Sequence, residues 1–115
     1  MKYMLLIHNN PAAIEALPDD EKTALFGQVD TVMKELQESG EWVGGAGLAE
    51  AARTKTVRVR DGATIVTDGP YLEAKEQFAG YLTVDVASED RAVEIAASWP
   101  DASLWGMEVR QLIGG

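Results

Sequence analysis

The chain has 115 residues, a formal net charge of −9 and no cysteine. Its length predicts a single domain, residues 1–115, that forms its own core. The acidic balance argues against binding to nucleic acid, because negative charge repels phosphate backbones. With no cysteine and with His8 as its one histidine, the sequence excludes disulfides, thiolate nucleophiles and a His-rich zinc site.

The sequence also predicts where the protein acts. No apolar run approaches the ~20 residues that cross a bilayer, and the N-terminal segment becomes polar too early for a signal peptide. We therefore expect a cytoplasmic protein that does not bind a membrane. The glycines of residues 44–50 lack the spacing of a phosphate-binding loop, so we expect no nucleotide cofactor and predict no other.

The first half of the chain predicts a strand, a long helix and a second strand. Residues 2–8 carry apolar side chains at both parities, which is typical of a strand buried on both faces. After a polar loop, Pro18 and Asp19 mark the start of an amphipathic helix that ends at Ser39 and Gly40. A glycine-rich strand follows within residues 41–50.

A β-hairpin is predicted next. Apolar and polar residues alternate in residues 55–60, and the alternation resumes at Ile65 after Asp61-Gly62, a dipeptide typical of a type I′ turn. The hairpin region is basic, unlike the rest of the chain. Such cations are typical of an edge strand that avoids pairing, or they attract an anionic small molecule or an acidic partner surface. The bases are Arg53, Lys55, Arg58 and Arg60.

The C-terminal part predicts a strand, a helix and a last strand. Residues 78–86 form the strand, and Ser88 caps a helix that Pro100 ends. The last strand lies in residues 104–113, with Trp105 and Met107 on one face.

This order predicts a ferredoxin-like α+β fold, βαβ-hairpin-βαβ, with an antiparallel sheet and two helices on one face. The first strand is apolar on both faces, so its second face needs another cover. We expect a second copy of the sheet to provide it in a homodimeric α+β barrel.

The segment around Asp68-Gly69-Pro70 differs from the hairpin turn. Pro70 cannot donate a ladder hydrogen bond, and the connection to the next strand at Phe78 is longer than a hairpin loop. Long charged loops are often functional. The alternative is a surface loop that only locks the fold.

The same segment carries a family resemblance. Residues 66–81, "VTDGPYLEAKEQFAGY", together with "MKYMLLI", "VRDG" and "MEVRQL", resemble the DGPF-motif branch of the YCII-related family over essentially the whole chain. Tyr71 stands where phenylalanine is usual. The resemblance implies a dimeric α+β barrel, in agreement with the patterning.

The resemblance implies less about activity. Some YCII-related proteins carry a histidine on the first helix and an aspartate before a proline, a pair that suggests acid-base chemistry. This chain has no histidine in residues 19–39 and has Trp99 before Pro100, so that pair is not carried over. Other members of the DGPF branch resemble accessory proteins encoded near alternative sigma factors, which implies a regulatory setting.

His8 is the residue type best suited to exchange protons near neutral pH. It ends the first strand, and Asp68 also lies at a strand end, so the two would form a pair if these ends converge. The alternative for His8 is a structural histidine bonded to a nearby loop. The candidate site residues are His8 and Asp68 for catalysis and Tyr71, Lys75, Phe78 and Tyr81 for substrate binding.

Two classes of function follow, and the residues alone leave both open. One is a cofactor-independent lyase, isomerase or hydrolase that works on a small molecule in a cleft. The other is a non-catalytic ligand-sensing or regulatory module, linked to transcriptional control through a protein partner that the basic hairpin contacts.

Overall fold

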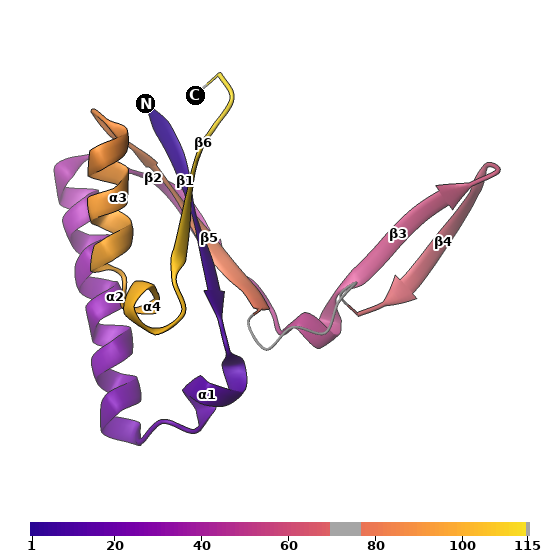
Figure 1. Ribbon diagram of the computed structural model, residues 1–115, viewed down its shortest axis with the longest axis horizontal. Coiled ribbons are helices and arrows are strands. Elements are labelled where there is room, and N and C mark those ends of the chain that lie inside the picture. Colours follow the sequence, from indigo (N-terminus) through magenta and orange to yellow (C-terminus); the bar gives the residue numbers. More distant parts are fainter. Residues whose placement is uncertain (70–76, 115) are drawn as a thin grey trace.

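The computed structural model describes residues 1–69 and 77–114 (Figure 1). The protein has an α+β fold. Its first half contains β1 (Lys2–Asn9), α1 (Pro11–Glu15), α2 (Asp19–Ser39), β2 (Trp42–Gly47) and a 3-10 turn, η1 (Ala51–Arg53). Its second half contains β3 (Lys55–Arg60), β4 (Ala63–Asp68), β5 (Gln77–Asp85), α3 (Glu89–Ser98), α4 (Pro100–Leu104) and β6 (Met107–Gln111).

Four strands form the central antiparallel sheet, in the order β2-β5-β1-β6. The strand β1 lies inside the sheet, where Leu5 is opposite Leu82 of β5 on one side and Val109 of β6 on the other. The N-terminal strand and the C-terminal strand are therefore neighbours, although they are the most distant strands in the sequence. In the described ranges, no helix has both the length and the apolar character needed to cross a membrane.

The core lies between this sheet and helices α2 and α3, which cover one of its faces (Figure 1). Tyr3 and Leu5 of β1 are 1% and 0% exposed. They pack in one cluster with Leu36 of α2 and Ile95 of α3. The alternation of the strand places these side chains on a single face, as the sequence predicts.

The other face of β1 is covered less completely. Met4 and Leu6 alternate with the core residues and are half-buried, although both are large and apolar. Tyr81 lies opposite Leu6, and Thr83 lies opposite Met4. Helices α2 and α3 lie on the opposite side of the sheet, so they do not cover this face.

The hairpin β3–β4 forms a separate two-stranded sheet that projects from the body (Figure 1). Asp61 and Gly62 have φ angles of 49° and 78°, so the predicted turn with two positive φ angles is confirmed. At the base of the hairpin, Lys55 forms an ion pair with Asp68. The Gly69 N–H donates to the Thr54 carbonyl at 2.7 Å, which closes the base.

Two short helices occupy segments for which the sequence predicted other structure. The predicted loop after β1 contains α1, because the Asn10 side chain accepts a hydrogen bond from the Ala13 N–H at 3.1 Å and Pro11 follows the cap. The predicted last strand was too long. Pro100 begins α4 directly after α3, and β6 starts only at Met107.

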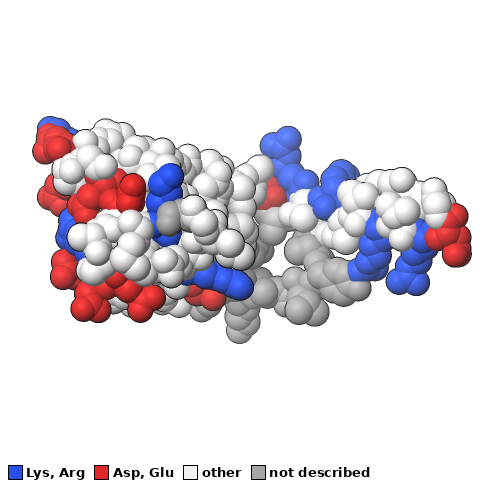
Figure 2. All heavy atoms as spheres, turned by 90° about the horizontal axis from the view of Figure 1, so that it is seen from above, with Lys and Arg blue, Asp and Glu red and all other residues white. Residues whose placement is uncertain are grey.

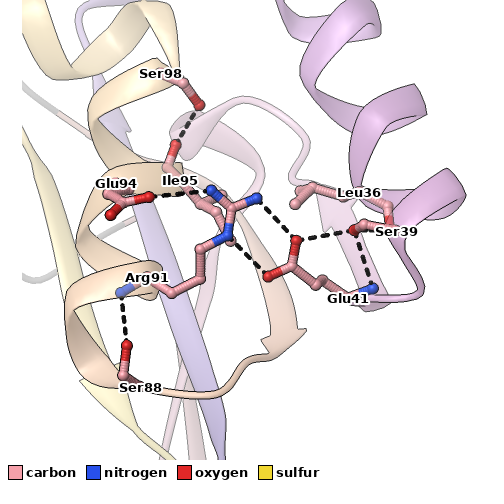
Figure 3. A network of polar contacts seen from close by, with 8 residues as sticks. All are labelled: Leu36, Ser39, Glu41, Ser88, Arg91, Glu94, Ile95 and Ser98. Carbon is pink, nitrogen blue, oxygen red and sulfur yellow. Dashed lines mark hydrogen bonds and ion pairs between the residues drawn. The ribbon is translucent and has the colours of Figure 1, made fainter.

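An ion-pair network joins the end of α2, the turn before β2 and α3 (Figure 3). Arg91 of α3 donates from Nε to Oε2 of Glu41 at 2.9 Å and from Nη2 to Oε1 at 2.8 Å. The Ser39 hydroxyl donates to the same carboxylate at 2.8 Å. These bonds hold the pKa of Glu41 below its ordinary value of 4.5, mainly through Arg91. The network fixes the turn between α2 and β2 onto α3.

We expect Glu41→Gln to lower the free energy of unfolding by about 1 kcal/mol at pH 7, a value between those of exposed and buried ion pairs. The lowered pKa of Glu41 means that its stabilisation is present above pH 4.5 and is lost as the pH falls further. The difference in the free energy of unfolding between wild type and variant, measured by urea unfolding, should therefore become smaller below that pH.

Glu94→Gln is the matched control. Its carboxylate contacts the same guanidinium at 3.2 Å but is 67% exposed, against 18% for Glu41. We expect it to cost less than Glu41→Gln. Equal costs for the two variants, or a Glu41→Gln gap that does not change with pH, would contradict this account of the network.

Candidate functional site

His8 lies near the end of β1, on the face of the sheet that points away from α2 and α3. The pairing of β1 with β5 is irregular here: Ile7 is opposite Gly80, whereas His8 is opposite Phe78. This bulge skips Ala79 and places the Phe78 ring beside the imidazole, with ring centroids 5.5 Å apart and planes tilted by 44°. The irregularity therefore joins a titratable ring to an aromatic ring.

A carboxylate on the neighbouring strand contacts the same histidine. Oε1 of Glu108, in β6, lies 2.5 Å from Nε2 of His8. The contact is not a well-directed hydrogen bond, because the buried Nε2 has no hydrogen-bond partner among the described residues, and it becomes an ion pair when the imidazole is protonated. A carboxylate in this place orients the ring.

A cavity of about 340 Å³ lies at the same end of the sheet, between α1, the segment from β2 to η1 and the start of β5. This size is within the range of small-molecule sites. Phe78 is both a wall of the cavity and the neighbour of His8, so it connects the two. The walls combine apolar Ile14, Leu48 and Phe78 with amides of Asn9 and Gln77 and carboxylates of Glu15 and Glu50.

Asn9 connects the cavity to a buried carboxyl group on the helix side of the sheet. Asp101, in α4, is 4% exposed. Burial raises the pKa of Asp101 above its ordinary value of 3.8, and a hydrogen bond from the Asn9 side chain opposes this rise. The Asp101 carbonyl also accepts hydrogen bonds from the N–H groups of Trp105 and Gly106, at 2.8 and 2.9 Å. Asp101 thereby ends α4 and supports the cavity wall through Asn9.

The structure brings some of the predicted site residues together. His8 and Phe78 are in contact, and Tyr81 lies opposite Leu6 on the same face of the sheet. Asp68 ends β4 in the hairpin, where it pairs with Lys55, and no contact between Asp68 and His8 is seen within the described ranges. Tyr71 and Lys75 lie outside the described residues.

Three residues of this region were not predicted from the sequence. They are Glu108, which contacts His8, and the pair formed by the Asn9 amide and the buried Asp101. Glu108 alternates with Met107 and Val109 in β6, which signals the face opposite the core. The neighbourhood of β1 and β6 would have placed it near His8. Asp101 gave no comparable signal, because it lies between the helix that was predicted to end at Pro100 and the strand that was predicted to begin at Leu104.

These residues offer proton exchange and apolar contact. Across the described ranges, no group of three or more histidine, aspartate or glutamate side chains is arranged to hold a metal ion. The arrangement is an α+β sheet whose strand ends hold an imidazole, a carboxylate and an aromatic ring beside a small cavity.

Comparison with known proteins gives the family. Residues 1–113 match the sequence model of the YCII-related domain. An uncharacterised protein of Rhizobium meliloti (strain 1021) is 32% identical over 114 residues, which cover 97% of this chain and 92% of that protein. The chain belongs to the YCII-related family.

Asp101→Asn tests the buried carboxyl group. The folded state holds the Asp101 proton more tightly than the unfolded state, so its contribution to stability falls as the pH rises above 3.8. The neutral amide avoids this loss, and Asn9 can turn its own amide to keep the hydrogen bond. We expect the variant to be more stable than wild type at pH 7 by about 1 kcal/mol, with no such advantage at the acid end.

The measurement is thermal unfolding across pH, with Asp30→Asn in the exposed middle of α2 as control. The control variant should show the same dependence of unfolding temperature on pH as wild type. An Asp101→Asn variant that is less stable than wild type at pH 7 would show that the ionised carboxylate is needed there.

Proposed function

We propose that the protein is a homodimer of the DGPF-motif branch that binds a small molecule in the cavity beside Phe78 and moves a proton with His8, without a cofactor. The single observation that supports this proposal most strongly is the His8–Glu108 pair against Phe78. Phe78 contacts the imidazole and forms part of the cavity wall. A proton-exchanging group thus lies one aromatic ring away from a ligand-sized space.

The chemistry of the proposal is general acid-base catalysis. A ligand that extends from the cavity past Phe78 gives a proton from a C–H or hydroxyl group to neutral His8, and Glu108 stabilises the imidazolium until the proton is returned. This serves a lyase-, isomerase- or hydrolase-like reaction. The carboxylates of Glu15 and Glu50 disfavour a free anion in the cavity, so a neutral ligand with an apolar or aromatic body fits best.

The residues predicted from the sequence keep their proposed roles. Tyr81 extends the apolar surface of the sheet beyond Phe78. Tyr71 and Lys75 precede Phe78 in the chain and are proposed to donate hydrogen bonds to the ligand. Asp68 is proposed to share proton transfer only if the ligand draws the base of the hairpin toward His8, since it pairs with Lys55 in this structure.

The homodimer is part of the same proposal. The central sheet, with helices on one face, leaves Met4 and Leu6 half-buried on the other, and a second sheet packed there would complete their burial. His8 and Tyr81 lie on that face, so the second copy would also close the site from the open side. The expected assembly is the dimeric α+β barrel.

A ligand-sensing or regulatory module is the second candidate. The observation that favours it is the projecting basic hairpin, which has no part in the cavity and offers a surface for a protein partner (Figure 2). In that case the cavity binds a metabolite without turnover. The two candidates differ in whether a bound ligand is chemically changed.

One experiment tests the cavity and the histidine together. Because His8 is the one histidine, its ring signals in NMR spectra need no assignment. Halogenated phenols, lactones and esters are screened for shifts of these signals and for turnover, after native mass spectrometry of the purified protein for a retained ligand. We expect His8→Ala to retain binding and to lower turnover by about 100-fold or more.

Phe78→Ala should weaken binding, because it removes a wall of the cavity. The matched control is Phe26→Ala in α2, since Phe26 is 55% and Phe78 44% exposed. Asp68→Asn measures the contribution of Asp68. Binding that survives Phe78→Ala unchanged would disprove the location of the site, and turnover that survives His8→Ala would remove His8 from the mechanism. Binding without any turnover would favour the sensing module.

A further inference from the structure

The hairpin of residues 55–68, here called the arm, has two different faces. The β3–β4 register places Val57 opposite Val66 and Val59 opposite Thr64 on one face. It places Arg58 opposite Ile65 and Arg60 opposite Ala63 on the other face. Val57 is 59% exposed, Val59 67% and Val66 57%. The arm therefore has an apolar face and a face that carries cations.

The arm is not covered by the body of its own chain in the described ranges. All residues of β4 are exposed, and only Thr56 and Arg58 of β3 are half-buried. A two-stranded hairpin alone is at best marginally stable in water, and adjacent exposed valines are typical of an interaction surface. Both properties indicate that another surface covers the arm.

The position of the arm indicates which surface this is. Figure 1 shows the arm on the side of the central sheet that faces away from α2 and α3. This is the side on which Met4 and Leu6 are incompletely buried. A molecule that packs on the open face of the sheet therefore lies on the same side of the body as the arm.

Charge supplies the second argument. The arm, residues 55–68, contains three bases and two acids and has a net charge of +1, whereas the rest of the chain has a net charge of −10. Figure 2 shows the bases along the arm and the acids concentrated on the body. Two copies joined only by their sheets would bring two acidic bodies together, whereas an arm places a positive segment against each acidic body.

We propose that the arm clasps a second copy of this chain. The valine face packs on the body of the second protomer, and Arg58 and Arg60 on the opposite face attract its acids at longer range. A two-fold dimer repeats this contact, so both arms are buried at once. The inference rests on the proposed homodimer and adds an interface that sheet packing alone does not contain.

The test uses Val57→Thr, Val59→Thr and Val66→Thr together. Threonine keeps the branched shape and the strand preference of valine but places a hydroxyl in the apolar contact. In analytical ultracentrifugation we expect the dimer dissociation constant to rise by about tenfold or more, because two apolar faces are altered per dimer. Ile65→Thr, on the opposite face of the arm, is the control and should change it much less.

Hydrogen exchange locates the contact. Backbone amides of residues 55–68 should exchange slowly at dimer concentrations and quickly in the triple variant, while β1 and β5 stay protected and so show that the body is folded. If the triple variant loses the hairpin itself, Arg60→Glu provides the test. That charge reversal should weaken the dimer at low salt and have less effect at high salt.

The outcomes separate the parts of the proposal. A triple variant and an Arg60→Glu variant that both dimerise like wild type, with an arm that exchanges quickly, would overturn the clasp and leave sheet packing in place. A wild-type protein that is monomeric at all concentrations would overturn both the homodimer and the clasp, while the ligand screen would still report on the cavity. An arm whose amides exchange quickly in the protein alone, and become protected only when an acidic protein is added, would also overturn the clasp.

Discussion

The central strand β1 is apolar on both faces, but the helices of the chain cover only one. Tyr3 and Leu5 are enclosed by α2 and α3, whereas Met4 and Leu6 depend on their neighbours in the sheet. Exposed apolar area of this kind costs free energy until another surface removes it from water. The proposed assembly, the closing of the site and the use of the arm all follow from this unequal covering.

The same alternation determines the chemistry at the end of β1. His8 and Asn9 are consecutive, so they point to opposite faces. His8 meets Glu108 and Phe78 on the open face, and Asn9 meets the buried carboxyl group of Asp101 on the helix side. Two residues of one strand thus join an imidazole, a cavity wall and a buried acid within a short distance along the chain.

Much of the fold could be predicted because its signals are local. Helical spacing in α2, the Ser88 cap and the Asp61-Gly62 turn each depend on a few adjacent residues. The short helices α1 and α4 were missed because five residues hold too little periodicity to separate a helix from a loop. The site was harder to predict, because the contact of His8 with Glu108 depends on which strands are neighbours, and its contact with Phe78 depends on a bulge between β1 and β5. No local sequence pattern indicates the strand order or the position of the bulge.

The segment from β2 to η1 has one more consequence. Leu48, Glu50 and Ala51 form walls of the cavity, and the chain continues from them directly into the arm. A force or a restraint on the arm therefore acts on the cavity through a few residues of backbone. By thermodynamic reciprocity, a partner on the arm that changes the affinity of the cavity for the proposed ligand has its own affinity changed by that ligand by the same factor. Dimer formation and small-molecule binding would then be linked within a single short polypeptide.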